Sequence, residues 1–416
     1  MNFDQITLSN GLRIIGERID HFRSVSVGLW LGSGSQFEVP SEAGVSHFLE
    51  HMVFKGTEKR SARKIAEEMD AVGGQLNAFT AKECTCFYAK VVDEHLPLAM
   101  DVIADLVTAP TFDAGELEKE KGVVIEEIAM SEDTPEDLVH ELLMLANFGD
   151  QPVARPILGN EERISTYVRD DLVSYWKRMY RPQNAVLALA GHYDWDSVVK
   201  LAEALLGKWS PEGFEKRGCV TNDVPPTLLV KEKDIEQIHI CMGFPGLTLG
   251  DDRNYELSVF NSVFGGAMSS RLFQKIREER GAAYTVYSYP NAYTDAGMLS
   301  VYAGTNPEAA VEVCGMIRDE ARKLAEQGMT AEEFAMAREQ LKASYILGLE
   351  STSARMQSIG RRMLLMNATR TEAEVIDRIE SITHESVNQM MREILSAPHS
   401  TALVGKDAER VSKEIG

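Results

Sequence analysis

Two histidines and a glutamate lie within five consecutive residues, and their spacing could place all three beside one metal ion. The stretch is His47-Phe48-Leu49-Glu50-His51. On a helix of 3.6 residues per turn, His47 and His51 share one face and Glu50 lies near it. Neutral imidazoles suit Zn²⁺, and a free carboxylate beside the metal suits a general base for an activated water. The spacing therefore predicts metal-assisted hydrolysis, with two histidine ligands and Glu50 as the base.

The third ligand must come from elsewhere, because a catalytic zinc site usually has three protein ligands. The segment 113–130 is predicted to be helical and contains Glu116, Glu120, Glu126 and Glu127. Glu120 and Glu127 share a helical face that borders apolar positions, whereas Glu126 points away from it. Acidic groups beside apolar positions are costly unless they are paired or bind a metal. We therefore predict that Glu127 is the third ligand and that Glu120 orients a ligand histidine.

The elements around these residues predict an α+β chain. Hydrophobic and polar residues alternate over 5–17 around Asn10-Gly11, which predicts a hairpin, and they alternate again over 24–31 and 75–92, which predicts further strands. A buried strand is predicted at 184–191. Helices are predicted around the two histidines and at 61–72, 96–108, 113–130, 134–147, 170–179 and 196–206.

The order of elements then begins again, and five short motifs recur in the same order. Their separations lie between about 210 and 217 residues. The pairs are Phe54-Lys-Gly56 with Phe264-Gly-Gly266, Lys64-Ile-Ala-Glu-Glu68 with Lys275-Ile-Arg-Glu-Glu279, Phe87-Tyr-Ala89 with Val301-Tyr-Ala303, Phe112-Asp-Ala-Gly-Glu116 with Met329-Thr-Ala-Glu-Glu333, and Ala188-Leu-Ala-Gly191 with Ala402-Leu-Val-Gly405. We predict two homologous domains, 1–212 and 227–416, each a mainly antiparallel sheet packed with helices, joined by a linker at 213–226.

The second copy lacks the side chains that could bind a metal. In that copy, the positions of His47, Glu50, His51, Glu120 and Glu127 are taken by Leu257, Phe260, Asn261, Ala337 and Ser344. A related domain can therefore fold without the polar set. We interpret the first copy as the catalytic, zinc-binding domain and the second as non-catalytic.

The motifs in both copies resemble those of the pitrilysin, insulysin and mitochondrial processing peptidase family of zinc peptidases. The resemblance covers nearly the whole chain, and the length matches the short two-domain subfamily, similar to the catalytic subunit of the processing peptidase. The matching motifs are His47-x-x-Glu50-His51 with Glu127 after 75 intervening residues, Asn77-Ala78-Phe79-Thr80, Phe264-Gly-Gly-Ala-Met-Ser-Ser-Arg-Leu-Phe273, and Arg277-Glu-Glu-Arg-Gly-Ala-Ala-Tyr284.

The resemblance implies a zinc-dependent endopeptidase with a closed chamber. His47, His51 and Glu127 would hold one Zn²⁺ per chain, and Glu50 would be the base. A flexible peptide or unfolded segment would add as a strand beside Asn77, Ala78 and Phe79.

The same resemblance assigns catalytic residues to the second copy. Tyr284 would donate to the oxyanion, and Arg277 would bind a substrate carbonyl. It also implies a homodimer in which Arg277 and Tyr284 act on the site of the partner chain.

Composition excludes several other classes of protein. The net charge of -21 disfavours a nucleic-acid binder. No stretch is apolar enough to span a membrane, and no signal peptide is apparent at the N-terminus. Five cysteines without a CxxC motif predict reduced thiols in the cytoplasm.

Two rival functions and the identity of the metal stay open at this level. A member of the same fold could bind peptides as a catalytically silent scaffold, and a zinc amidase could act on small molecules instead. Manganese or cobalt could also occupy two histidines and one glutamate. The remaining histidines are expected at the surface or in the core, and Met356, Met363 and Met366 are expected to pack in the core.

Overall fold

The computed structural model describes residues 3–214, 218, 220–222 and 224–415, and these residues form two compact units. Each unit combines segments from both halves of the chain. Unit 1 consists of Met1–Ile128, Arg155–Cys219 and Ile346–Glu372, and unit 2 consists of Ala129–Ala154, Val220–Tyr345 and Ala373–Gly416. The linker predicted at 213–226 includes residues 215–217, 219 and 223, which lie outside the described residues.

Unit 1 is built on a six-stranded mixed sheet in the order β1-β2-β6-β3-β5-β4. The neighbours β2 and β6 are parallel, and the other neighbouring strands are antiparallel. As a result, β4 is an edge strand that pairs with β5 on one side. The strands are β1 (Asp4–Thr7), β2 (Arg13–Arg18), β3 (Ser24–Leu31), β4 (Gln75–Thr80), β5 (Thr85–Val92) and β6 (Ala185–Gly191).

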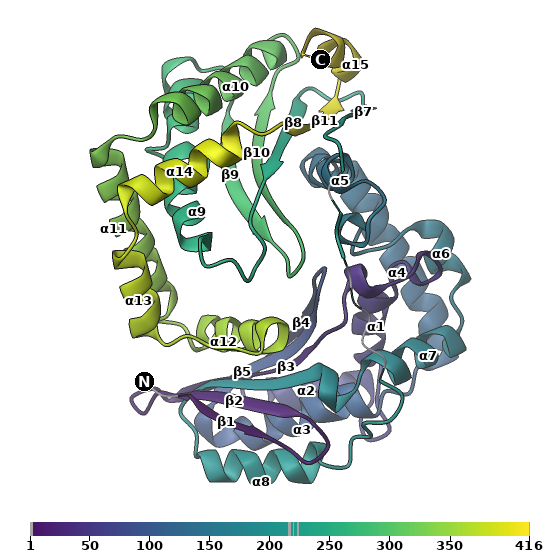
Figure 1. Cartoon of the computed structure of the whole chain (residues 1–416). Helices are drawn as coiled ribbons and strands as arrows, with labels where there is room; N and C mark the ends of the chain where they lie inside the picture. Colours follow the sequence, from purple (N-terminus) through teal and green to yellow (C-terminus); the bar gives the residue numbers. More distant parts are fainter. Residues whose placement is uncertain (1–2, 215–217, 219, 223, 416) are drawn as a thin grey trace. The chain divides into compact units, whose positions relative to one another are not determined.

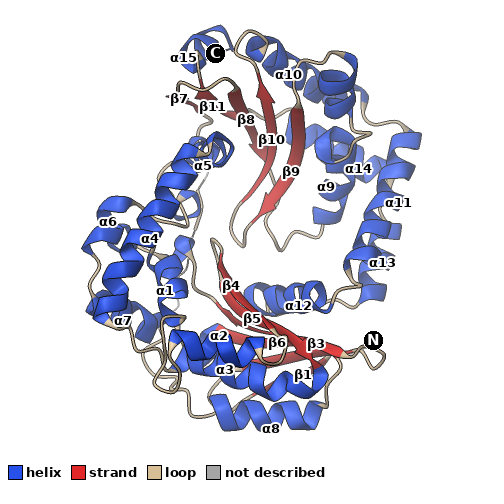
Figure 2. Cartoon of the chain, turned by 180° about the vertical axis from the view of Figure 1, so that it is seen from behind, coloured by secondary structure: helices blue, strands red, loops and turns tan. Residues whose placement is uncertain are grey.

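Helices cover both faces of this sheet (Figure 1). On β3, Val25, Val27 and Leu29 point into the core formed with α3 (Leu96–Thr108), on which α8 (Trp195–Leu206) packs. The intervening residues of β3 face α12 (Thr352–Met366), and Figure 2 shows that helix beside β3 and β6. Trp30 Nε1 lies 3.4 Å from Met356 Sδ across this contact. Successive side chains of β3 point to opposite faces of the sheet, and helices cover both faces. This explains why every residue from Val25 to Leu31 is buried.

Unit 2 repeats this design with a five-stranded mixed sheet in the order β7-β11-β8-β10-β9. Here β7 and β11 are parallel, and the other neighbours are antiparallel. One face packs on α9, α10 and α14, and the other face is covered by α5 (Pro135–Phe148). The strands are β7 (Leu228–Glu232), β8 (Ile238–Pro245), β9 (Thr285–Ala292), β10 (Gly297–Thr305) and β11 (Ser400–Gly405).

The two sheets correspond strand by strand, with β1 as an addition in unit 1. The chain is thus an α+β protein of two similar domains, as the sequence predicts. The structure adds that each sheet has one face covered by a helix from the other half of the chain. In unit 1 this helix is α12, from the second half, and in unit 2 it is α5, from the first half.

The remaining helices connect and flank these layers. They are α1 (Val45–Val53), α2 (Ala62–Asp70), α4 (Ala114–Asp133), α6 (Glu161–Thr166), α7 (Arg169–Met179), α9 (Asn254–Asn261), α10 (Ala310–Gln327), α11 (Ala331–Gly348), α13 (Glu372–Glu380), α14 (His384–Leu395) and α15 (Ala408–Ile415), with π-helical segments at Ser262–Gly266 and Phe273–Glu279. Among the described residues, no helix has the length and apolar character needed to cross a membrane.

Candidate metal centre

The helix α1 positions the two histidines and the glutamate through its apolar face. Val45, Phe48, Leu49 and Met52 follow the spacing of one helical face, and each is at most 1% exposed. Burying these four residues in the core of unit 1 fixes the rotation of the helix. The opposite face, which includes the polar positions 47, 50 and 51, is consequently turned away from the core.

The helix α4 supplies the acidic side chains. Leu117, Val124 and Ile128 anchor it in the same core, and Glu120 and Glu127 project toward α1. The sequence places both Val123 and Val124 beside this acidic row, but only Val124 is buried. Val123 is 44% exposed, so the row lies at the margin of the core.

Three side chains converge at a spacing that fits one metal ion. Glu127 Oε2 lies 3.5 Å from His51 Nε2 and 3.8 Å from His47 Nε2. One ligand atom from each of the three residues lies within 4.8 Å of the other two. Ligands about 2.1 Å from a tetrahedral Zn²⁺ would be separated by about 3.4 Å, so the observed spacing is close to that of a coordinated set.

The protonation state of His47 favours metal binding. Burial, with a further contribution from the neighbouring His51, lowers the pKa of His47 to about 4. His47 is therefore neutral at physiological pH, and its Nε2 lone pair is available to a ligand. The donor set of two imidazoles and one carboxylate thus fits Zn²⁺, which binds both histidine nitrogen and carboxylate oxygen.

His51 is held from behind by a short chain of polar contacts. Its Nδ1 lies 2.9 Å from Glu120 Oε1, which leaves Nε2 facing Glu127. Lys55 Nζ in turn lies 2.5 Å from Glu120 Oε2. The sequence did not indicate Lys55, which lies in the turn that follows α1.

Glu50 is fixed by the end of the edge strand. Thr80, the last residue of β4, donates from Oγ1 to Glu50 Oε2 at 2.5 Å. Burial raises the pKa of Glu50, and the Thr80 hydrogen bond opposes this change. A carboxylate with a raised pKa is better matched to proton transfer near neutral pH. Thr80 belongs to the Asn77–Thr80 motif, but its contact with Glu50 could not be read from the sequence.

The residues predicted to bind substrate lie on β4. Asn77, Ala78 and Phe79 are consecutive in this edge strand, which ends at the Glu50 contact. The amide N–H of Ala78 donates to the side-chain oxygen of Asn77 at 2.8 Å. Phe79 packs edge-on against Trp30 of β3, with ring centroids 5.5 Å apart, and this contact anchors the strand.

Arg277 and Tyr284 lie together in unit 2. The guanidinium of Arg277 stacks 4.9 Å from the Tyr284 ring centroid and 4.8 Å from that of Phe273. Tyr284 is 77% exposed, so its hydroxyl faces solvent. The spacing of seven residues across a π-helical segment therefore brings the two predicted side chains side by side within their unit.

Unit 2 also contains a polar network that the sequence did not indicate. His140 on α5 lies 2.8 Å from Tyr289 Oη through Nδ1 and 3.2 Å from Tyr287 Oη through Nε2. Tyr287 then donates to Glu136 Oε1 at 2.8 Å. The buried Cys241 thiol lies beneath, 3.4 Å from His140 Nδ1. Burial raises the pKa of Cys241 well above its ordinary value, so the thiol is protonated and unreactive.

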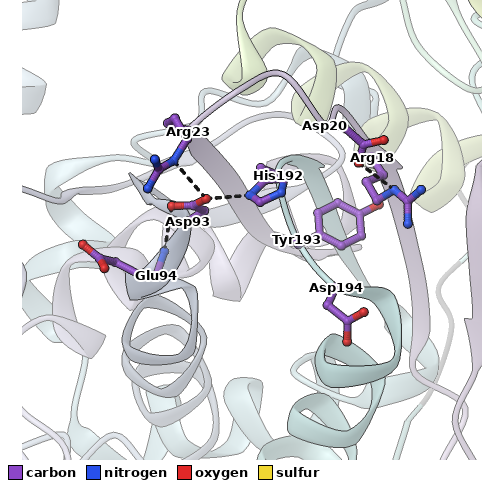
Figure 3. Close-up of a pocket in the computed structure, with 8 residues that line it drawn as sticks. All are labelled: Arg18, Asp20, Arg23, Asp93, Glu94, His192, Tyr193 and Asp194. Atoms are coloured by element: carbon purple, nitrogen blue, oxygen red, sulfur yellow. Dashed lines mark hydrogen bonds and ion pairs between the residues drawn. The ribbon is translucent and has the colours of Figure 1, made fainter.

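A hollow of about 490 Å³ lies elsewhere on unit 1 (Figure 3). It is at the end of the sheet where Ser24 pairs with Val92, whereas Glu50 is bonded near the opposite end, where Leu31 pairs with Thr85. Charged side chains in its lining pair with one another, as in Arg23 with Asp93 and Arg18 with Asp20, so it is not a second candidate centre. The lining residues are Arg18, Asp20, Arg23, Asp93, Glu94, His192, Tyr193 and Asp194.

Two family profiles match consecutive parts of the chain. Residues 13–161 match "Insulinase (Peptidase family M16)", and residues 166–341 match "Peptidase M16 inactive domain". A Bacillus subtilis protein named as an uncharacterized zinc protease is 44% identical over 398 residues, covering 96% of this chain and 97% of that protein. A Mycobacterium tuberculosis protein with the same type of name is 40% identical over 410 residues, covering 98% and 94%.

Two solved structures share the fold at low sequence identity. A peptidase M16 inactive domain from Pseudomonas fluorescens superposes with a TM-score of 0.90 at 19% identity, covering 98% of each chain. A protease from Helicobacter pylori also gives a TM-score of 0.90 at 19% identity, covering 97% of this chain and 99% of that one. These two structures show the fold alone, whereas the two profiles and the relatives at 40–44% identity show the family.

Proposed function

Because the chain belongs to peptidase family M16, in its short two-domain form, we propose that it is a zinc-dependent endopeptidase for flexible peptides and unfolded segments. The observation that carries the proposal is the convergence of His47, His51 and Glu127 next to Glu50. The names of the relatives as zinc proteases support the choice of metal and reaction.

In this proposal each polar residue of the candidate metal centre has a defined role. His47, His51 and Glu127 would hold one Zn²⁺, which when bound supplies Lewis-acid chemistry toward a water and a carbonyl. Glu50 accepts the proton of the attacking water and passes it to the leaving amine. Thr80 donates to Glu50 Oε2 and so restricts the rotation of this carboxylate.

Glu120 and Lys55 support the ligand His51. Glu120 accepts a hydrogen bond from His51 Nδ1, which keeps the Nε2 lone pair free for the metal. Lys55 contacts the other carboxylate oxygen, Oε2, and thereby fixes the orientation of Glu120. The pair therefore acts on ligand geometry and basicity without touching the substrate.

The substrate would bind by strand addition at β4. An extended peptide can pair with the free edge formed by Asn77, Ala78 and Phe79, provided that it displaces the Asn77 side chain from the Ala78 N–H. Main-chain pairing reads little sequence, so selectivity should depend on flexibility and length. An unfolded peptide of about 20 residues should thus be cleaved faster than a blocked dipeptide. A preference for the dipeptide would instead favour a small-molecule amidase.

Arg277 and Tyr284 are proposed to complete the site of a partner chain in a homodimer. Their mutual stacking and the exposure of Tyr284 support a role in ligand contact. Tyr284 would donate to the oxyanion and Arg277 to a substrate carbonyl. Mixing Glu50→Gln chains with Tyr284→Phe chains should then restore part of the activity. If the mixture stays as inactive as its components, action on a partner is excluded.

The central test is digestion of an unbiased peptide library by the wild type and by Glu50→Gln. We expect cleavage by the wild type and a loss of about 10²- to 10⁴-fold in the variant, with one zinc per chain retained in both. Zinc binding without Glu50-dependent cleavage would favour the alternative, a silent peptide-binding scaffold. The four free, buried cysteines among the described residues support a reducing, cytoplasmic location, which cell fractionation can check.

A further inference from the structure

The first turn of α1 has an unusual need for an external hydrogen-bond acceptor. The residue before the helix, Gly44, has φ of 81° and no side chain to accept from the first N–H groups. A Cβ at this position would lie 2.5 Å from the carbonyl oxygen of Leu158. Close packing therefore excludes the serine, threonine or aspartate that usually caps a helix, so the acceptor must come from elsewhere in the chain.

Glu38 supplies that acceptor with both carboxylate oxygens. Its Oε2 accepts from Gly44 N–H and its Oε1 from Ser46 N–H, each at 2.8 Å. The residue is only 1% exposed, although a buried carboxylate is expensive unless it is fully bonded. Its backbone is also held, because the carbonyl oxygen of Glu38 accepts from the guanidinium of Arg155. A rigidly placed carboxylate thus accepts hydrogen bonds from the N–H groups of Gly44 and Ser46, on either side of the first helical residue.

The position of His47 depends on this contact more than the positions of Glu50 and His51 do. Glu50 is bonded by Thr80 and His51 by Glu120, so each has a side-chain partner on another element. His47 Nδ1 is buried without any partner among the described residues. His47 is the third residue of α1, next to Ser46. Its position therefore depends on the backbone of the first turn, which Glu38 fixes.

We propose that Glu38 is a positioning residue for the metal centre, which clamps the first turn of α1 and so holds His47 at coordinating distance from His51 and Glu127. The proposal rests on the metal binding in the proposed function, but not on peptide hydrolysis. Without the clamp, the first turn frays and one of three ligands is lost part of the time. Metal affinity then falls, while the ligand His51 keeps its contact with Glu120.

The test compares Zn²⁺ affinity by chelator competition in Glu38→Gln and in the control variant Glu17→Gln. Glutamine has the same shape, but an NH₂ donor replaces one of the two carboxylate oxygens, so one of the two backbone N–H groups loses its acceptor. Glu17 is also a buried carboxylate of unit 1, but it lies on β2 and pairs with Arg355 on α12. We expect zinc affinity to fall about 10- to 100-fold in Glu38→Gln and to stay near wild type in Glu17→Gln.

The measurement is made at pH 8, because burial raises the pKa of Glu38 to about 7 and the carboxylate must be ionised. Equal affinity in Glu38→Gln and the wild type overturns the clamp, and so does an equal loss in both variants. Wild-type chains that bind zinc but cleave no peptide contradict the proposed function and leave the clamp standing.

If Glu38→Gln does not fold, amide hydrogen exchange of the wild type decides. The clamp requires the Ser46 N–H to be protected as strongly as the core of unit 1. Exchange of Ser46 at the rate of an unbonded amide overturns the proposal.

Discussion

The helices α1 and α9 occupy corresponding places in the two units but use them in opposite ways. In α9, Leu257 and Phe260 are at most 1% exposed, and Phe260 stacks on Phe264 with ring centroids 5.6 Å apart. Asn261 accepts a hydrogen bond from Ser288 Oγ at 2.7 Å. In α1 the corresponding positions hold His47, Glu50 and His51. The two histidines face Glu127, and Glu50 is bonded to Thr80.

The difference separates the requirements of the fold from those of the site. Unit 2 closes this position with apolar packing. In unit 1, burial raises the pKa of Glu50 and lowers that of His47, so the surroundings disfavour the charged form of each side chain. Such groups contribute little to stability without a metal, and their presence is explained by chemistry.

The largest expected effect comes from exchanging the two kinds of residue. Phe260→Glu should destabilise unit 2 by about 4 kcal/mol or more, because it removes a buried ring and buries an unpaired carboxylate. Glu50→Leu should change the stability of unit 1 by no more than about 1 kcal/mol, because it removes a carboxylate whose burial is unfavourable. The same variant should lose peptide hydrolysis.

Urea unfolding can follow the two units separately. All four tryptophans, Trp30, Trp176, Trp195 and Trp209, belong to unit 1, so their fluorescence reports on that unit. Far-UV circular dichroism reports on both units. A destabilisation by Glu50→Leu as large as that by Phe260→Glu would show that the polar set is needed for folding.

The starts of the two helices differ in their response to pH. Burial raises the pKa of Glu38 to about 7, while an unfolded glutamate titrates near 4.5. Between these values the folded state keeps a proton that the unfolded state has lost. The free energy of unfolding of unit 1 should therefore fall by about 3 kcal/mol as the pH rises from 4.5 to above 7.

The start of α9 should not show this dependence. There Asp251 accepts from Arg253 N–H at 2.9 Å, and the Arg253 side chain lowers the pKa of Asp251. The measurement is the tryptophan-detected stability of the wild type minus that of Glu38→Gln at each pH. A difference that stays constant from pH 4.5 to 8 would contradict the assigned titration.

The smallest effect concerns the exchanged helices. On unit 1, α12 packs Met356 and Met363 into an apolar cluster with Trp30, as the sequence predicts, whereas Met366 is only partly buried. On unit 2, α5 presents His140 to the hydroxyls of Tyr287 and Tyr289. We expect His140→Leu to destabilise unit 2 by about 1–3 kcal/mol, because buried hydroxyls lose their partner.

The matched substitution on α12, Met356→Leu, should destabilise unit 1 by less than about 1.5 kcal/mol, since it conserves apolar volume. Both values come from urea unfolding followed by circular dichroism and fluorescence. Equal effects of the two substitutions would mean that the polar network of α5 adds nothing specific to its packing.

Much of the site could be predicted from local spacing. The apolar positions of α1 turn His47 and His51 to one side, and the seven-residue separation puts Glu120 and Glu127 on one face of α4. The repeat could be found because each copy of the fold keeps its apolar pattern. The partners Lys55, Thr80 and Glu38 were not found, because their contacts depend on how loops and neighbouring elements pack.

The sequence by itself determined the element types, the two similar sheets and the candidate ligand set, because hydrophobic periodicity and residue chemistry are local properties. The tertiary structure decided the exchange of α5 and α12 between units, since either helix has an apolar side that any sheet face could cover. It also decided which groups hold each polar residue of α1, because Glu38 reaches Gly44 and Ser46 only after the intervening loop has folded back on the helix start.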